Sequence, residues 1–520
     1  MSSTLILVLH AHLPYVRQPS QKATIEELWF LEAMWETYLP LLDLLQKYDR
    51  EHSDPLLALS ISPPLAEMMR DPLMNEKFKA HITSLEALAR SEIRRTNGTE
   101  HQKTALMYMN KICSANNVYE LCKGSILDAF RRLQDSGAVE LLATATTHAF
   151  LPAYQGEPDA VRNQIRIGIN YYCRMFGRRP KGFWLPECGY YEGLEQILFN
   201  EGIEYFFVEG HGLINGNPVP LCSVHKPVIT PCGVRVFGRD MNACSQVWSS
   251  ESGYPGADSY RDFYRDIGFD LPTDYISSFF HDFGARVFTG FKYYSVAQTE
   301  GEKVPYDRQK ALQQAGAHAA CFVSDRTKDF DELSKYCKSP VIVAAFDAEL
   351  FGHWWFEGIE WLSHVIEMSS CEKINFKLNS PSVYLLELSD SLQVTTPSAS
   401  SWGEGGYNAC WINKGSGRYY RHLLRMPEML KIFNEKSVRP GLLKDAHDQA
   451  LREMLLSESS DWFFLINKKR AGEYAEKRLI RHINNFDLIV KNALTGELSE
   501  KVLNEMEYDN PFIKDIGAMI

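Results

Sequence analysis

Short apolar runs that end in a polar or ionisable residue recur along the chain. Seven runs show this pattern: Thr4–Leu9, Pro55–Ser62, Ala138–Thr144, Gly182–Leu185, Glu204–Val208, Val234–Phe237 and Val341–Phe346. Runs of this length predict strands of a parallel sheet, because both faces of such strands are buried. The polar residues that follow them are His10, Ser62, His148, Glu187, Glu209, Arg239 and Asp347.

Helical spacing of apolar residues fills most intervals between these runs, including residues 25–48 and 160–176. Because the carboxyl ends of the strands in a parallel α/β barrel meet at one mouth, the ionisable residues there predict an active site. Seven strands predict a distorted (β/α)7 barrel, an α/β fold related to the eight-stranded barrel. A doubly wound open sheet fits the alternation nearly as well, although no dinucleotide fingerprint follows the first strand.

The chain length of 520 residues predicts more than one domain. Residues 1–397 form the strand-rich catalytic barrel, with a helical insertion at about 65–136. A loop-rich, aromatic region at about 188–300 predicts a small inserted or lid region. Residues 398–520 open with a Ser- and Gly-rich stretch and then follow a helical pattern, which predicts a C-terminal helical domain that contributes to the cleft.

Charge and composition exclude several classes of function. The net charge is −11 and no basic run occurs, so we expect binding neither to nucleic acid nor to anionic membranes. The first apolar run is too short for a signal peptide, and no window approaches the length of a membrane span. The 11 cysteines include no CxxC pair, which favours reduced thiols and a cytoplasmic location.

Glu187 and Asp347 each follow a predicted strand directly. Two carboxylates at one mouth are what glycoside chemistry requires, with one as nucleophile and the other as acid and base. A burial-raised pKa keeps the acid protonated near neutral pH. The alternative is that each carboxylate caps a helix or pairs with an arginine, which is the commoner role of an isolated acid. Nearby tryptophans favour the catalytic interpretation: Trp184, Trp354 and Trp355.

His10, His12 and His148 stand at strand ends, and an H-x-H pair with a third histidine can bind zinc. No acidic ligand is adjacent in HAHLP. We therefore expect these histidines to hydrogen-bond sugar hydroxyls, with no metal and no cofactor. His353 is either a site residue or a buried packing residue, and the sequence leaves both possibilities open.

Trp402 and Trp411 flank a glycine-rich turn, which suits either sugar stacking or docking of the helical domain. Asp461 and Trp462 follow a serine-rich stretch that resembles a helix N-cap. Their functional interpretation is that the helical domain reaches into the cleft. No G-x-S-x-G elbow and no P-loop occurs, so a serine hydrolase and a nucleotide-binding enzyme are not indicated.

Five motifs, in order along the chain, resemble those of glycoside hydrolase family 57, and within it the branching enzyme group. The motifs are HAHLPYV (His10 to Val16), ATTHAFLP (Ala145 to Pro152), GFWLPECGY (Gly182 to Tyr190), FDAELFGHWWFEG (Phe346 to Gly358) and SSDWFFL (Ser459 to Leu465). The resemblance implies a (β/α)7 barrel with an inserted region and a C-terminal helical domain. It also implies that Glu187 is the nucleophile and Asp347 the general acid/base.

The family resemblance further implies a mobile loop whose tyrosine covers the cleft, and WSSESGYPG makes Tyr254 the candidate. It implies that Trp402 and Trp411 line the acceptor side. The chain departs from the family pattern at Tyr294, where a tryptophan is expected, and the stretch HDFGARVFTG is shorter. The expected substrate-binding residues are His10, His12, His148, Trp184, Arg239, Asp240, Tyr254, His353, Trp402, Trp411, Asp461 and Trp462.

The resulting hypothesis is a retaining 1,4-α-glucan branching activity that acts on amylose or glycogen-like α-glucan and forms α-1,6 branches. A 4-α-glucanotransferase or α-amylase on the same scaffold is an alternative. A glucan-binding homologue without activity is another, and a metal-dependent deacetylase that uses the three histidines is a third. The oligomeric state is left open.

Overall fold

The structure is a computed structural model that describes residues 3–49, 55–249, 252–281, 283–389, 391–436, 441–469 and 471–520. Its centre is a parallel sheet that contains all seven predicted strands. In spatial order these are β10 (Val341–Asp347), β1 (Ser3–Ala11), β2 (Leu57–Ile61), β3 (Val139–Thr144), β4 (Gly182–Trp184), β5 (Tyr205–Val208) and β7 (Arg235–Gly238). Each neighbouring pair is parallel.

The sheet curls until its two outer strands approach each other. The amide N–H of Asp240, just after β7, donates to the carbonyl oxygen of Val343 on β10 at 2.9 Å. At the other end of β10, Asp347 lies opposite His10 of β1 in the register. The distorted (β/α)7 barrel predicted from the sequence is therefore confirmed, and an open doubly wound sheet is not formed.

The described residues also form four strands that were not predicted. β6 (Val228–Ile229) pairs antiparallel with β7, and β11 (Phe376–Leu378) pairs with β1. These two are too short to leave a periodic pattern. β8 (Tyr294–Thr299) and β9 (Glu302–Pro305) form a hairpin with several exposed positions, so it lacks the apolar run of a buried strand.

Helices of the barrel part cover the sheet and build the insertion. Their bounds are α1 (Glu27–Ala33), α2 (Leu39–Asp49), α3 (Pro63–Arg70), α4 (Pro72–Arg95), α5 (Gln102–Leu121), α6 (Ile126–Ser136), α7 (Pro158–Phe176), α8 (Leu194–Asn200), α9 (Gly210–Ile214), α10 (Met241–Trp248), α11 (Ile267–Asp270), α12 (Thr273–Ser277), α13 (Arg308–Leu333), α14 (Gly358–Ser369) and α15 (Pro381–Glu387). A π-helical turn, Met34–Tyr38, joins α1 to α2. The predicted helical insertion corresponds to α3 through α6.

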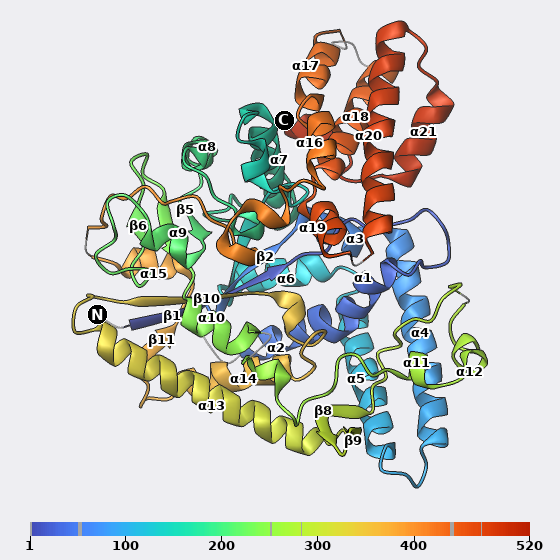
Figure 1. The fold of residues 1–520 in the computed structure, drawn as a ribbon, viewed down its shortest axis with the longest axis vertical. Helices are drawn as coiled ribbons and strands as arrows, with labels where there is room; N and C mark the ends of the chain where they lie inside the picture. The colour runs from blue at the N-terminus through green and yellow to red at the C-terminus, as the bar shows by residue number, and fades with distance from the viewer. Residues whose placement is uncertain are drawn as a thin grey trace.

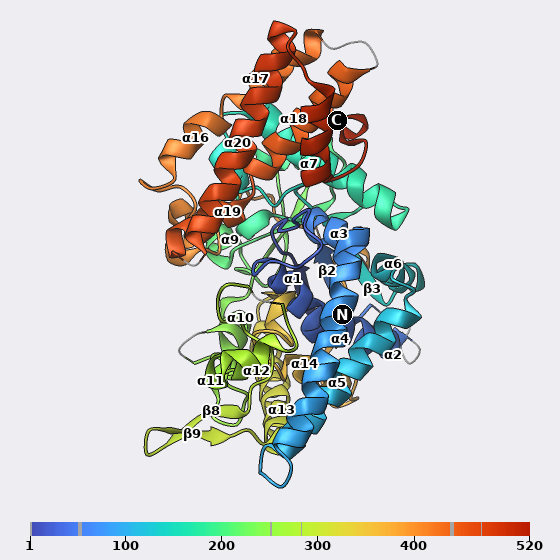
Figure 2. The ribbon, with the colours of Figure 1, turned by 90° about the vertical axis from the view of Figure 1, so that its right-hand side faces the viewer.

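The C-terminal part is helical, as predicted. Its helices are α16 (Gly417–Leu423), α17 (Met426–Lys436), α18 (Leu442–Ser457), α19 (Ser460–Lys468), α20 (Gly472–Thr495) and α21 (Glu500–Asp509). They gather at one end of the long axis, above the sheet (Figure 1). The β8–β9 hairpin projects at the opposite end (Figure 2).

The helical domain is tied to the chain that leaves β1. Arg478 of α20 donates to the backbone carbonyl oxygens of Tyr15 at 2.9 Å and Arg17 at 3.2 Å. Arg17 in turn pairs with Asp71 at 2.7 Å. Because His10 and His12 immediately precede this segment, the contact fixes the helical domain relative to the mouth of the barrel.

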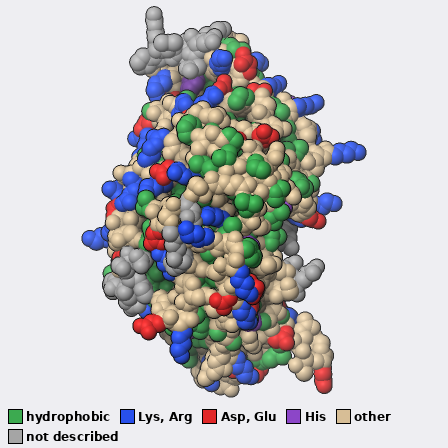
Figure 3. Space-filling model, turned by 90° about the vertical axis from the view of Figure 1, so that its left-hand side faces the viewer, with side chains coloured by type: hydrophobic (Ala, Val, Ile, Leu, Met, Phe, Trp, Pro, Cys, Tyr) green, Lys and Arg blue, Asp and Glu red, His purple; other side chains and the backbone are tan. Residues whose placement is uncertain are grey.

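The surface carries both signs of charge. Acidic and basic side chains are interspersed over the face shown in Figure 3. Within the described residues, no helix combines the length and the apolarity needed to cross a membrane.

Candidate active site

Glu187 lies in a 3₁₀ turn, Pro186–Cys188, directly after β4. Its backbone is left-handed, with φ 58° and ψ 20°, and His148 after β3 has φ 57°. Such a conformation costs a non-glycine residue on the order of 1–3 kcal/mol and persists only where the surroundings hold it in place. Asp347 is the last residue of β10. Both carboxyl groups therefore stand at the carboxyl ends of their strands, as predicted.

The Glu187 carboxylate is held by groups from outside the barrel strands. Ser460 Oγ, at the start of α19, donates to Oε1 at 2.8 Å. Trp402 Nε1 donates to Oε2 at 2.6 Å, and the Trp402 backbone N–H donates to the Glu187 carbonyl oxygen at 3.0 Å. Both carboxylate oxygens are thus oriented by residues from the C-terminal part of the chain.

Three histidine rings stack beside this carboxylate. The ring centroids of His12 and His148 are 3.8 Å apart, and those of His10 and His148 are 4.9 Å apart. His10 Nε2 and His148 Nε2 are hydrogen-bonded at 2.9 Å. His148 Nδ1 lies 2.8 Å from Ser460 Oγ, and His12 Nε2 lies 2.9 Å from Asp461 Oδ2. Asp461 of the C-terminal part therefore contacts His12 after β1, and its role in substrate binding stays a prediction.

The same three histidines bring one nitrogen each to within 4.8 Å of one another, a spacing that a metal ion could use. Their hydrogen bonds oppose this use. His12 already engages Ser62 through Nδ1 at 2.7 Å and Asp461 through Nε2, and both nitrogens of His148 are also engaged. Because a metal would have to displace these partners, the arrangement favours oriented hydrogen-bonding groups over metal ligands.

The electrostatics of the two carboxyl groups differ from those of exposed acids. Burial raises the pKa of Glu187 to about 7, opposed by hydrogen bonds that include those from Trp402 and Ser460. Burial, followed by the nearby charge of Glu187, raises the pKa of Asp347 to about 7. Two interacting acids with such values titrate as a pair. One of them is thus able to hold a proton near neutral pH while the other is ionised.

The groups around the pair have defined protonation states. Burial lowers the pKa of His10 and His148 well below the usual value, and neighbouring histidines lower it further. Both rings are therefore neutral at pH 7. Burial alone would raise the pKa of Asp461, but the charge and hydrogen bond of His12 lower it to about 2.

Glu349 is a site residue to which sequence reasoning assigned no role. It lies in the 3₁₀ turn Ala348–Leu350, where its Oε1 accepts from the His12 backbone N–H at 3.1 Å and from the Tyr38 hydroxyl. Burial, and then the charge of Asp347, raises its pKa to about 8. Its position two residues after Asp347 was a usable signal. Ser460 belongs to the motif SSDWFFL, whereas no feature of the sequence indicated that Tyr38 lies at the site.

Three tryptophans that were predicted to bind sugar are buried. Trp184 is fully buried, and its ring lies 5.3 Å from His10. Trp411 is buried and stacks on Phe150 at 4.3 Å. Trp462 is buried and donates to the Leu456 carbonyl oxygen at 2.8 Å. None of these rings has an exposed face available for stacking on a sugar in this structure, and Trp411 instead lies near Glu187 and lowers the pKa of that carboxyl.

Asp240 and His353, two further predicted sugar-binding residues, contact protein groups. Asp240 caps α10 by accepting from the Ala243 backbone N–H at 2.7 Å, and it binds His225 Nε2 at 3.0 Å. His353 Nδ1 lies 2.5 Å from Glu36 Oε2. Each side chain is thus engaged with a protein partner, and sugar binding by either residue stays a prediction.

Arg239 contacts residues that lie around the two carboxyl groups. It pairs with Glu209, donates to the Ala345 carbonyl oxygen at 3.1 Å and places its guanidinium carbon 5.2 Å from the Trp402 ring centroid. Its charge also opposes the rise in the pKa of Asp347. Arg239 therefore holds Trp402, which in turn holds Glu187.

The Tyr254 ring packs against α13. It stacks on His318 with centroids 4.2 Å apart and is buried. Residues 250 and 251 of the same stretch lie outside the described residues. Closure of this loop over the cleft remains a prediction.

Comparison with known proteins decides the family. Residues 6–394 match the family model described as glycosyl hydrolase family 57. The chain belongs to this family. Residues 420–520 match a second model, described as the C-terminal region of 1,4-alpha-glucan branching enzyme. The family 57 resemblance expected from the five motifs is therefore confirmed.

Relatives of this family 57 protein cover nearly the whole chain. It is 32% identical to 1,4-alpha-glucan branching enzyme TK1436 of Thermococcus kodakarensis, over 98% of this chain and 78% of the relative. The TK1436 crystal structure superposes with a TM-score of 0.87 at 30% identity, covering 98% and 95% of the two chains. The structure of the alpha-amylase AmyC from Thermotoga maritima superposes with a TM-score of 0.92 at 36% identity, covering 100% and 99%.

Substitution of Ser460 tests the hydrogen bond from its hydroxyl to the Glu187 carboxylate. Ser460→Ala removes a donor to Glu187 and the Nδ1 partner of His148. Because a hydrogen bond to a charged group contributes about 1.5–3 kcal/mol, kcat on amylose should fall about tenfold to hundredfold. Initial rates measure this, with Ser277→Ala on exposed α12 as the matched control. A Ser460→Ala rate equal to that of the wild type would contradict the assignment.

The raised pKa values of Glu187 and Asp347 predict a dependence of activity on pH. Catalysis needs one proton on the pair, so activity should fall as the pH rises above about 7, when the acid loses its proton. It should also fall at lower pH, when the nucleophile becomes protonated. Measuring kcat from about pH 5 to about pH 9 tests this bell-shaped profile. A kcat that stays constant across pH 7 would show that the pair does not titrate there.

Proposed function

We propose that this protein is a retaining 1,4-α-glucan branching enzyme. This proposal rests mainly on one observation. Residues 420–520 match the C-terminal model of branching enzymes, and this segment contains Ser460, which donates to the Glu187 carboxylate, and Asp461, which binds His12. The part of the chain that resembles branching enzymes is thus in contact with the catalytic machinery. The TK1436 likeness over almost the whole chain supports the same activity.

In the first half-reaction, the Glu187 carboxylate attacks C1 of a glucose unit in an α-1,4-linked chain. The bond from C1 to the leaving oxygen breaks, and Asp347 gives its proton to that oxygen. The product is a glycosyl ester on Glu187 and a shortened chain. The hydrogen bonds from Ser460 and Trp402 orient the nucleophile for this attack.

In the second half-reaction, Asp347 is ionised and accepts the proton of an acceptor 6-hydroxyl. The hydroxyl oxygen attacks C1, the ester bond breaks and Glu187 is released as a carboxylate. Two inversions at C1 give net retention and an α-1,6 branch. The neutral rings of His10 and His148 are hydrogen-bonded to each other, and His148 contacts Ser460, so they orient the donor to Glu187 without adding charge beside the pair.

Transfer exceeds hydrolysis only if the acceptor is positioned better than water. In the proposal, the stretch around Tyr254 closes over the cleft and excludes water, and the partly exposed Trp402 contributes to the wall beside Glu187. The physiological role proposed is synthesis of glycogen-type α-glucan in the cytoplasm, which is compatible with eleven free cysteines.

An α-amylase activity is the second candidate, because the AmyC structure superposes over the full chain. In that case water, instead of a sugar hydroxyl, attacks the glycosyl ester. A 4-α-glucanotransferase would transfer the chain to a 4-hydroxyl. All three activities share the first half-reaction, so only the product separates them.

The product from amylose is the third prediction. Wild-type protein should generate new α-1,6 anomeric signals in the proton NMR spectrum of the glucan. Glu187→Gln removes the nucleophile's charge while keeping its shape, so it should abolish turnover and preserve glucan binding. Shorter chains without α-1,6 signals would rule out branching in favour of amylase or 4-α-glucanotransferase activity. No wild-type turnover would favour a glucan-binding homologue.

A further inference from the structure

Five neighbouring aromatic rings, of which four are exposed and Phe263 is partly buried, are here called the aromatic platform: Trp248, Phe263, Tyr264, Phe288 and Trp354. Trp354 is 51% exposed and Tyr264 is 70% exposed. The Phe263 ring centroid lies 5.3 Å from that of Tyr264 and 6.2 Å from those of both Phe288 and Trp354. The Trp354 centroid in turn lies 5.9 Å from that of Trp248. A contiguous exposed patch of large aromatic residues is a feature of binding surfaces.

The buried side chain of Lys292 packs against two rings of the platform. Lys292 Nζ lies 4.2 Å from the Phe263 centroid and 5.0 Å from the Phe288 centroid, and Lys292 is itself buried. His353, fixed by Glu36, meets Phe263 edge-on at 5.8 Å. These contacts fix central rings of the platform. A ligand that stacks on rings already fixed in place loses less free energy to ordering them.

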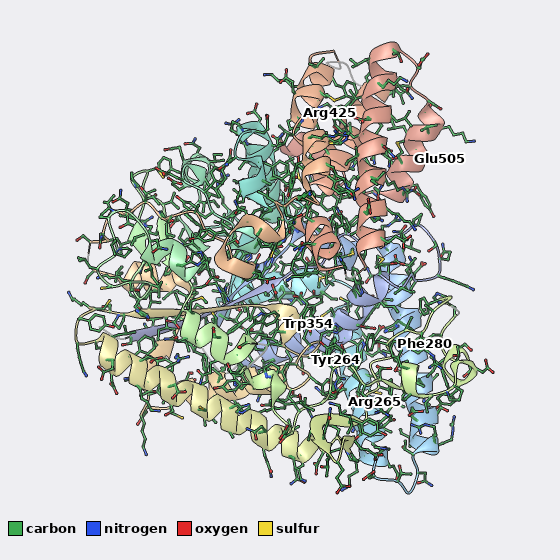
Figure 4. All side chains as sticks on the ribbon, viewed as in Figure 1. Tyr264, Arg265, Phe280, Trp354, Arg425 and Glu505 are labelled. Carbon is green, nitrogen blue, oxygen red and sulfur yellow. The ribbon has the colours of Figure 1, made fainter. Side chains whose placement is uncertain are left out.

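The platform begins at the turn that carries the general acid/base. Trp354 follows Asp347 by seven positions, and its backbone N–H donates to the Glu349 carbonyl oxygen at 3.1 Å. Glu349 in turn contacts the His12 backbone. Trp354 and Tyr264 come from different segments and lie near each other, with Arg265 beyond Tyr264 (Figure 4). The platform is therefore joined, through the backbone of Trp354, to the turn that follows Asp347.

We propose that the aromatic platform binds a segment of α-1,4-glucan chain outside the catalytic cleft. This inference rests on the proposed function, which makes an α-glucan the substrate. The flat C–H faces of glucose units match aromatic rings, and the platform is continuous with the turn after Asp347. A polymer engaged at the carboxylate pair extends beyond it, and the platform holds that extension.

The test measures retention in a native gel that contains glycogen, using proteins that also carry Glu187→Gln so that the polysaccharide is not consumed. Tyr264→Ala should weaken retention about twofold to tenfold, as expected for one stacking ring. Tyr264→Phe keeps the ring and should retain the parent mobility. Tyr336→Ala, at a tyrosine 67% exposed elsewhere on the surface, is the matched control and should also match the parent.

Equal retention of the Tyr264→Ala protein and its parent would overturn the proposal. So would a Tyr264→Phe protein that loses as much retention as Tyr264→Ala, because ring stacking would then not be the cause. Unchanged retention with a change in oligomeric mass by light scattering would assign the platform to contact between copies. The gel measures binding without turnover, so its outcome is independent of whether the wild-type product contains α-1,6 branches.

Discussion

The active site depends on keeping two carboxyl groups, those of Glu187 and Asp347, close together and out of water. Burial is the largest influence on both, and it raises the pKa of each to about 7. In water such groups would both be ionised at neutral pH, and neither would serve as an acid. The parallel strands bring them to one mouth, but strands alone leave that mouth open. The rest of the chain supplies the cover and the hydrogen bonds that this arrangement requires.

The helical domain contributes to the active site directly. Its α19 provides Ser460 to Glu187 and Asp461 to His12, and its α20 is fixed to the segment after β1 through Arg478. A shift of the helical domain would therefore move the nucleophile's donor and the histidine stack together. The two regions that match separate family models are therefore in direct contact at the Glu187 carboxylate.

The sequence was sufficient for the barrel and for the position of Glu187 and Asp347 at strand ends, because buried parallel strands leave unbroken apolar runs. It was not sufficient for the neighbours. Ser460 and Glu187 are 273 positions apart, so no local pattern connects them. Trp184, Trp411 and Trp462 were assigned to sugar binding because a sequence does not distinguish a buried ring from an exposed one. Asp240 follows a strand just as Asp347 does, yet it caps a helix.

The most direct test of the account is to trap the covalent intermediate. Wild-type protein would be incubated with an α-glucosyl fluoride whose ring fluorine slows the second half-reaction, and its peptides analysed by mass spectrometry. One added fluoroglucosyl unit is expected, on the peptide that contains Glu187. Consumption of the reagent with the label on another residue, or with no label on any peptide, would contradict it.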